Sequence, residues 1–220
     1  MKWTIRIATI LCVTLIFSAC ITPPKSPEPP SPSVPSLPLP PPQSSQSLSW
    51  EAGHDERKAW SKALLGIIEK DLEIYLLASD LPIICPKIKS LEKEKQIRAI
   101  AEFWIATIYH ESGFDPRSQS VDVGSKDKRS TWSIGLTQIS EIDQEWVSLD
   151  RRYSYDELLT PEPNMKLANA IMVRQINRNK KILLDNSSKD RYWAVLLVGN
   201  KYSEIKNIIE RVQNKTGFCL

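Results

Sequence analysis

The sequence predicts a mostly α-helical domain that follows an export signal and a proline-rich linker. Apolar residues recur at helical spacing across residues 50–220, prolines concentrate between residues 21 and 49, and a short apolar run ends at Cys20. We therefore expect a signal peptide at residues 1–19, a lipid-modified cysteine with its tether at residues 20–49, and one folded domain at residues 50–220.

The first 20 residues have the features of a bacterial lipoprotein signal. Lys2 and Arg6 form a basic start, an apolar run of about 11 residues follows, and residues 17–20 (Phe-Ser-Ala-Cys) end like the sequence before an acylated cysteine. A membrane-spanning helix needs roughly 20 apolar residues, so this run is short for a retained anchor. We expect Cys20 to carry a lipid, with simple secretion as the alternative. Ile21, rather than aspartate, after the cysteine favours the outer membrane, with the domain in the cell envelope facing the periplasm.

The tether is defined by its proline content. Eleven of the sixteen prolines lie in residues 21–49, mixed with serine and almost no charge. Such a segment cannot bury a core and samples the polyproline II conformation. At about 3.1 Å per residue it would reach roughly 90 Å when extended, so we expect a spacer between a membrane and the domain.

Charge and cysteine content restrict the partners and the compartment. The formal net charge is +3, from 29 basic and 26 acidic residues, and removal of the signal with Lys2 and Arg6 leaves +1. No basic stripe is present, so nucleic acid is not favoured as a partner.

Cys85 and Cys219 are the only cysteines of the expected domain. In an oxidising compartment we expect them to form a disulfide, with two buried thiols as the alternative.

Five segments carry helical apolar spacing or helix-boundary signals. They are residues 60–77, 90–112, 140–146, 164–184 and 203–212. Gly113 ends the second segment, and Ser140 with Asp143 three residues later indicates a capping box at the start of the third. Residues 121–132 are polar and irregular, which fits a loop or a small hairpin.

Glu111 stands where a helix usually avoids an acid. It lies in the last turn before Gly113, and residues three, four and seven positions earlier (Ile108, Thr107 and Trp104) share the apolar face. Burial and the negative end of the helix dipole both raise the pKa of a carboxyl placed there. A partly protonated carboxyl is what a glycosidase needs to protonate a glycosidic oxygen. A solvated glutamate at a helix end is the alternative.

Three short motifs together resemble the soluble lytic transglycosylase family, which has a lysozyme-like fold. Residues 111–114 read Glu-Ser-Gly-Phe, residues 135–138 read Gly-Leu-Thr-Gln, and residues 161–164 read Pro-Glu-Pro-Asn. The first two match the family's helix-ending Glu-Ser and its Gly-Leu-x-Gln turn, and the third resembles the start of its long helix. The resemblance covers roughly residues 97–198 and implies that peptidoglycan glycan strands are the substrate.

The resemblance also implies a mechanism that uses one carboxylate and no cofactor. Glu111 would protonate the leaving oxygen and then, as a base, help the muramic acid 6-hydroxyl close onto its own anomeric carbon, leaving 1,6-anhydromuramic ends. A hydrolytic muramidase would need a second acid, for which Asp115 and Asp122 are the nearest candidates. A non-catalytic glycan-binding lipoprotein is a further alternative.

By the same resemblance, Gln138 and the backbone at Gly135 and Leu136 line the glycan groove, where glycine lets the main chain approach a sugar. A Gln138 that only bonds its own turn is the alternative. Ser133 stands where the family usually has alanine, which allows an added hydrogen bond to the substrate. Trp132 is expected either to stack on a sugar ring or to lie in the core.

The family's late Tyr-Asn pair is absent. Residues 191–196 (Arg-Tyr-Trp-Ala-Val-Leu) resemble instead a lipoprotein branch of the family, and on that mapping Tyr192 would steady the catalytic carboxyl or serve as a core tyrosine. His110 and Glu111 match the start of a zinc-protease motif, but Phe114 stands where its second histidine is needed. We therefore expect no catalytic metal.

Overall fold

The computed structural model describes residues 47–121, 128–188 and 190–220. The predicted signal peptide, Cys20, almost all of the tether and Asp122 lie outside the described residues. Within the described ranges, no helix combines the length and apolar character needed to cross a membrane.

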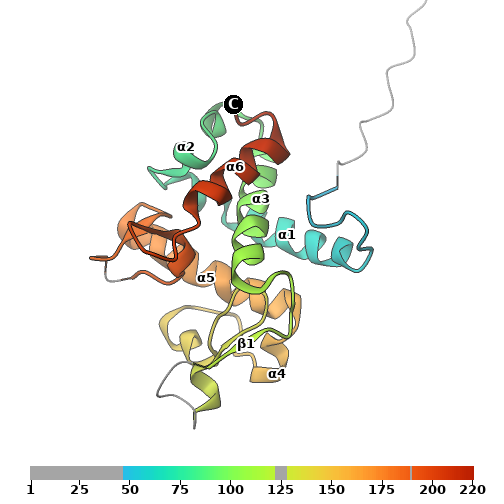
Figure 1. The fold of residues 1–220 in the computed structure, drawn as a ribbon, viewed down its shortest axis with the longest axis vertical. Coiled ribbons are helices and arrows are strands. Elements are labelled where there is room, and N and C mark those ends of the chain that lie inside the picture. The colour runs from blue at the N-terminus through green and yellow to red at the C-terminus, as the bar shows by residue number, and fades with distance from the viewer. Residues whose placement is uncertain (1–46, 122–127, 189) are drawn as a thin grey trace, which may run out of the picture. The chain divides into compact units, whose positions relative to one another are not determined.

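Four helices form the framework of the domain. They are α1 (Arg57–Leu76), α3 (Lys93–Ser112), α5 (Pro161–Asn179) and α6 (Ile205–Thr216). Helix α3 packs against α1 and α6, and α1 also packs against α5 (Figure 1). The C-terminal end of α3 leads toward β1 at the end of the domain that also holds α4 (Figure 1).

Short elements connect these helices. They are α2 (Leu81–Ile84), α4 (Tyr155–Leu158), and the 3-10 helices η1 (Ile88–Ser90), η2 (Arg129–Thr131), η3 (Glu141–Trp146) and η4 (Ala194–Leu196). Strands β1 (Gln119–Ser120) and β2 (Ser133–Ile134) pair antiparallel, and strands β3 (Leu184–Asp185) and β4 (Leu197–Val198) pair parallel. The predicted mostly α-helical fold is confirmed.

The predicted helix at residues 164–184 is too long at its C-terminal end. Helix α5 ends at Asn179, because Lys180 adopts a left-handed conformation with φ 53°. The next residues are then held by Asp80, whose carboxylate accepts the backbone N–H groups of Ile182 at 2.9 Å and Leu183 at 2.7 Å. A side chain about 100 residues earlier therefore competes for the N–H groups that a longer helix would use.

Helix α3 is buried along most of its length, including an acid. Glu102 is 1% exposed, and its Oε1 accepts the backbone N–H of Ser49 at 2.9 Å. Leu48 and Trp50, on either side of that serine, belong to the hydrophobic core, and Trp50 Nε1 donates to Ser61 Oγ on α1 at 2.7 Å. Residues 48–50 are thereby fixed to both α1 and α3.

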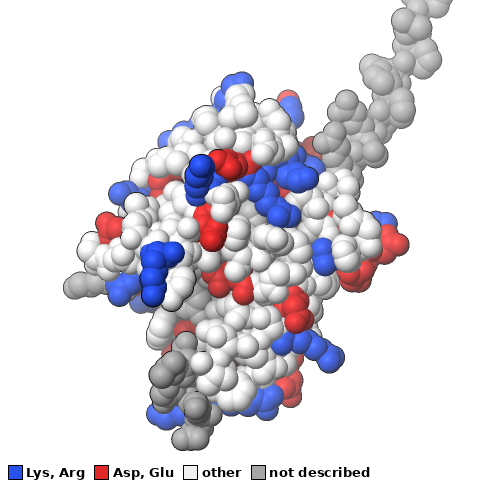
Figure 2. Space-filling model, viewed as in Figure 1, with Lys and Arg blue, Asp and Glu red and all other residues white. Residues whose placement is uncertain are grey.

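Surface charges are mixed on the face drawn in Figure 2. Basic and acidic side chains alternate there across a largely uncharged surface. This distribution is consistent with the small net charge of +3.

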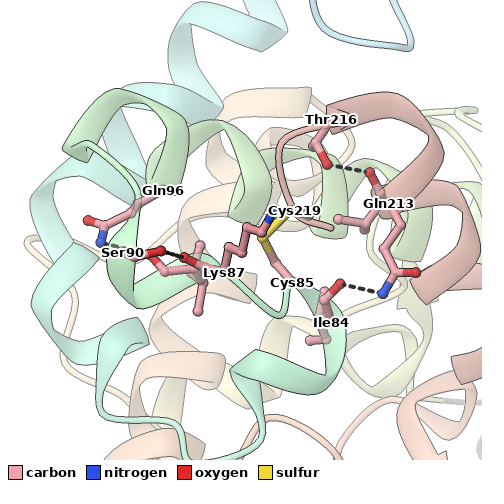
Figure 3. The surroundings of a disulfide bond; sticks show 10 residues. Ile84, Cys85, Lys87, Ser90, Gln96, Gln213, Thr216 and Cys219 are labelled. Carbon is pink, nitrogen blue, oxygen red and sulfur yellow. Dashed lines mark hydrogen bonds between the residues drawn. A yellow bond between two sulfur atoms is a disulfide. The ribbon is translucent and has the colours of Figure 1, made fainter.

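Cys85 and Cys219 form a disulfide that joins the end of α2 to the C-terminus of the chain (Figure 3). Both cysteines are buried, and the Lys87 N–H donates to the Cys219 carbonyl at 3.1 Å. Gln213 of α6 adds a bond from its Nε2 to the Ile84 carbonyl at 3.4 Å. Helix α6 is thus attached to the α2 segment by covalent and polar contacts.

We expect the double substitution Cys85→Ser with Cys219→Ser to lower the free energy of unfolding by about 2–5 kcal/mol, because the bridge restricts the unfolded chain. The two cysteines are 134 residues apart in the sequence, so the loop closed is long. Urea unfolding of the variant and of the wild type, each with and without reductant, measures the loss. The reductant should lower only the wild-type midpoint; equal midpoints for wild type and variant without reductant would contradict the expectation.

Candidate active site

Glu111 occupies the last turn of α3. Gly113 follows with φ 62° and donates its N–H to the Tyr109 carbonyl at 3.0 Å, which ends the helix. The glutamate is half-buried, and burial raises the pKa of its carboxyl from 4.5 to about 7. Within the described parts of the chain, no hydrogen bond or ion pair holds this carboxyl. Near neutral pH it is therefore a partly protonated acid.

The chain around this helix end is fixed from two sides. Phe114 has an unusual positive φ of 70°, and its ring lies 4.8 Å from the guanidinium of Arg57 and 5.7 Å from that of Arg211. Trp50 meets the same ring edge-on, with centroids 6.1 Å apart. Helices α1 and α6 therefore both restrain the segment that follows Glu111.

The Gly-Leu-Thr-Gln turn is organised by Asn164, which is completely buried at the start of α5. Its Oδ1 accepts the backbone N–H of Thr137 at 3.0 Å and the Thr137 hydroxyl at 2.7 Å. Its Nδ2 donates to the carbonyls of Ile134 at 3.0 Å and Leu158 at 2.9 Å. A single side chain thus satisfies four buried polar groups and ties the turn to α4 and α5.

The contact with Asn164 also explains the glycine of this turn. Gly135 has φ 75°, and a Cβ at this position would lie 2.2 Å from Asn164 Nδ2 and 2.7 Å from the Leu158 carbonyl oxygen. Gly135 and Leu136 are both buried. The glycine therefore provides room for Asn164 inside the protein.

Gln138 ends the turn with φ 50° and is half-buried. Its Nε2 donates to the carbonyls of Gly135 at 2.9 Å and Ser118 at 3.3 Å. The amide nitrogen is therefore used within the protein, and the amide oxygen is the atom left for a ligand.

The two residues before the turn lie at its edge. Ser133 is half-buried and pairs with Ser120 across the two short strands. Trp132 is half-buried, packs against the core, and meets Tyr155 edge-on with centroids 6.5 Å apart. Trp132 therefore combines a core contact with a partly exposed ring.

A chain of buried contacts holds the turn against α3. Trp193 Nε1 donates to the Thr137 carbonyl at 2.8 Å, and the Trp193 ring meets Trp104 edge-on at 5.3 Å. Trp104 lies two helical turns before Glu111 and donates to the Tyr75 hydroxyl at 2.7 Å, which donates in turn to Asn169. The turn is thus connected to the face of α3 that also carries Glu111.

Tyr192 is bonded to Asp143 and shows no hydrogen bond to Glu111 in the described structure. Its hydroxyl donates to Asp143 Oδ2, which also accepts the backbone N–H of Ser140 at 2.7 Å. Burial raises the pKa of Asp143, and burial together with the nearby carboxylate raises the pKa of Tyr192. Among the described residues, no direct contact between Tyr192 and Glu111 therefore supports the predicted role of Tyr192 in steadying the catalytic carboxyl.

Asp143 is a further buried acid, which the sequence identified only as part of a helix cap. The Ser-x-x-Asp spacing reveals the cap, but nothing in the sequence signals a bond to a tyrosine 49 residues later.

Asp115, one of the two candidates for the second acid of a muramidase, lies in an exposed turn, where its Oδ1 accepts the Arg117 N–H at 2.8 Å. Among the described residues, no group of three or more His, Cys, Asp or Glu side chains is placed to hold a metal ion.

We expect the raised pKa of Glu111 to make stability depend on pH in one direction. Below pH 4.5 the carboxyl is protonated in both folded and unfolded chains, whereas between pH 4.5 and about 7 only the unfolded chain ionises. Unfolding then releases a proton, so the folded state loses stability as the pH rises through this window. The variant Glu111→Gln has no such carboxyl, so its Tm should exceed the wild-type Tm by a difference that grows between pH 4.5 and about 7 and stays constant at higher pH. Thermal unfolding at a series of pH values measures this difference, and a constant difference from pH 4 to 8 would exclude the shift.

Comparison with known proteins gives a family and a structural relative. A family model described as the transglycosylase SLT domain matches residues 89–208. No curated protein matches the chain. Among solved structures, wild-type DslA of Bdellovibrio is 26% identical, with a TM-score of 0.64, and the match covers 79% of this chain and 98% of that chain.

Two further DslA structures carry a glutamate-to-glutamine substitution. They are 26% and 25% identical to this chain, with TM-scores of 0.64 and 0.62, and each match covers 79% of this chain and 97% of that chain.

Proposed function

The chain belongs to the transglycosylase SLT family, whose domain acts on peptidoglycan in the cell envelope, and on this premise we propose that it is a lytic transglycosylase with Glu111 as the single acid/base. The bond cleaved would be the β-1,4 bond between N-acetylmuramic acid and N-acetylglucosamine. The products would carry 1,6-anhydromuramic ends.

The observation that carries this proposal is the half-buried position of Glu111 in the last turn of α3, where burial raises the pKa of its carboxyl to about 7. A carboxyl with that pKa is present in both forms near neutral pH, so it can give a proton and later take one back. The family's Gly-Leu-x-Gln turn, which Trp193 and Trp104 connect to α3, supports the same assignment.

The proposed reaction balances with one carboxyl. Glu111 donates its proton to the glycosidic oxygen as the bond from that oxygen to the anomeric carbon breaks. The 6-hydroxyl of the same muramic acid then attacks the anomeric carbon, and its proton passes to the Glu111 carboxylate. The acid is regenerated and no water is consumed.

Hydrolysis is the second candidate, and one observation favours it. The two glutamates replaced in the DslA variants are eleven residues apart in that protein. In this chain Asp122 stands eleven residues after Glu111. A muramidase that activates water needs a second carboxylate of this kind.

Digestion of purified sacculi by the full-length protein in heavy-oxygen water separates the two reactions. Cyclisation gives anhydromuramic products without the heavy label, whereas hydrolysis places the label on the new reducing end. We expect unlabelled anhydro products, and we expect Asp115→Asn and Asp122→Asn to retain the wild-type rate. Labelled products with an inactive Asp122→Asn variant would replace the transglycosylase by a muramidase, and binding to sacculi without any release would indicate a non-catalytic glycan-binding lipoprotein.

We also propose that residues 1–19 are removed on export and that Cys20 is lipidated, so that residues 20–49 tether the domain at residues 50–220 to the outer membrane. The lipobox-like ending and the proline-rich composition support this arrangement. Metabolic labelling with a fatty acid should mark the wild type and leave Cys20→Ser unlabelled. Equal processing and location of both proteins would favour simple secretion.

A further inference from the structure

Phe114 has a backbone conformation that its surroundings must hold in place. Its φ of 70° lies in the left-handed region, which residues with a side chain seldom adopt. It stands three residues after Glu111, in a turn closed by the Asp115 N–H, which donates to the Ser112 carbonyl at 3.1 Å. Strained residues of this kind persist only where packing fixes them, and they gather at functional sites. The contacts of the Phe114 ring therefore bear on the position of Glu111.

The Phe114 ring is surrounded by side chains from α1, α3, α6 and the segment before α1. These are Arg57, Tyr109, Arg211 and Trp50, respectively. Trp50 meets the ring edge-on with centroids 6.1 Å apart, and it lies outside residues 89–208, which the family model matches. A residue beyond the matched segment thus helps to hold the turn after Glu111.

Trp50 is itself fixed at both its ring and its carbonyl. The side chain is 2% exposed, and its Nε1 donates to Ser61 Oγ at 2.7 Å. Its carbonyl accepts Nη1 of Arg57 at 3.0 Å, and its ring meets Trp60 edge-on at 5.6 Å. All three of these partners are residues of α1. Trp50 therefore presents a rigid edge to Phe114.

Residues 47–50, called the N-terminal brace below, are also bonded to α3. Nη2 of Arg98 donates to the Ser47 carbonyl at 2.8 Å, and Glu102 accepts the Ser49 N–H at 2.9 Å. The two α3 side chains are four residues apart, so they lie on one face of the helix. Oε2 of Glu102 is buried without a hydrogen-bond partner among the described residues. Detaching the brace would leave Oε1 unpaired as well, and the cost of an unpaired buried acceptor keeps the brace in place.

We propose that Trp50 is a positioning residue for Glu111, acting through Phe114, and the proposal rests on the proposed function for the role of Glu111. The Trp50 ring prevents Phe114 from moving away from α3, so the turn and the last helical turn, which carries Glu111, stay in register with a bound glycan. A displacement of about 1 Å at a catalytic group can lower the rate by about 100-fold. The brace therefore affects the rate of the chemical step more than it affects glycan binding.

The test compares three single variants of the full-length protein. Trp50→Leu removes the aromatic edge that faces Phe114, whereas Trp50→Phe keeps an aromatic ring and loses only the Nε1 donor and some volume. Ile84→Ala is the control, because Ile84 is a fully buried residue of α2 near the disulfide (Figure 3), and its truncation destabilises the core elsewhere. Urea unfolding gives the stability of each variant, and activity is measured where all three are folded.

We expect Trp50→Leu to lower kcat on soluble glycan strands by about 10-fold to 100-fold, with KM changed by less than about twofold. Trp50→Phe should recover kcat to within about threefold of the wild type, and Ile84→Ala should keep the wild-type kcat and KM. A Trp50→Leu protein with the wild-type kcat would overturn the proposal. So would an Ile84→Ala protein whose kcat falls as far, because stability alone would then set the rate.

A second measurement does not depend on the proposed reaction. The carbon-13 shift of the Glu111 carboxyl, assigned with Glu111→Gln, gives the pKa of that group in each protein. Trp50→Leu should lower this pKa from about 7 toward 4.5, because a loosened helix end admits water to the carboxyl. Trp50→Phe and Ile84→Ala should leave it unchanged.

None of the three substitutions alters the charged groups around this helix end, which are Arg57, His110, Asp115, Glu204 and Arg211. A change in the pKa of Glu111 therefore reports its surroundings and not a lost charge. An unchanged pKa in Trp50→Leu would overturn the proposal. A wild-type protein that releases no glycan would refute the proposed function instead, and the comparison of pKa values would remain valid.

Discussion

Glu111→Gln is expected to lower the rate of glycan release from sacculi by about 100-fold to 10,000-fold, the range typical of losing general acid/base catalysis. Glutamine keeps the size and shape of the side chain but has no proton to donate at neutral pH. The same change removes a carboxyl whose pKa burial has raised to about 7. Folding should therefore be unaffected or slightly improved, because a half-buried acid at a helix C-terminus is unfavourable for stability.

Asp115→Asn is the matched control for this prediction. It removes a carboxylate four residues after Glu111, and asparagine retains the oxygen that accepts the Arg117 N–H. Release of soluble muropeptides and the melting temperature are measured for both variants. Activity should fall only for Glu111→Gln. A Glu111→Gln protein that releases products at a near wild-type rate would remove the basis of the proposed mechanism.

Local sequence patterns predicted the long helices because the relevant signals lie within the helices themselves. The apolar spacing at residues 60–77 and 90–112 corresponds to α1 and α3, and Gly113 ends α3 as expected. The end of α5 was wrong by several residues, because Asp80 binds the N–H groups that a longer helix would use. The segment at residues 140–146 is a 3-10 helix, a distinction that capping residues alone do not make.

The candidate site was predictable only where short motifs carry it. Glu111 and the turn at residues 135–138 are recognisable in the sequence, and the structure connects the turn to α3 through Trp104 and Trp193. The partner of Tyr192 was not predictable, because Asp143 lies 49 residues away and its own spacing suggests only a cap. Long-range side-chain pairs of this kind become visible only when the fold brings distant segments together.

Asn164→Ala is expected to lower the free energy of unfolding by about 3 kcal/mol or more, because it leaves several buried polar groups without partners. The Thr137 N–H and hydroxyl and the Leu158 carbonyl lose their bond to Asn164, and the Ile134 carbonyl keeps only its bond from the Ile139 N–H. Asn177→Ala is the control, since Asn177 lies on the exposed face of the same helix and should change stability by about 0.5 kcal/mol or less. Urea unfolding measures both losses, and similar values for the two variants would show that the four bonds at Asn164 contribute little.

Gly135→Ala extends the test to the contact between the turn and Asn164. Alone it should be strongly destabilising, because φ is 75° and the new Cβ would lie 2.2 Å from Asn164 Nδ2. In the double variant with Asn164→Ala that clash is absent, although the backbone strain and the Leu158 carbonyl at 2.7 Å from the Cβ remain. The double variant should therefore lose less stability than the sum of the single variants, by about 0.5–3 kcal/mol, the range of coupling between residues in contact. Strict additivity in the same unfolding measurements would mean that Gly135 is required by its backbone conformation alone and not by the space that Asn164 fills.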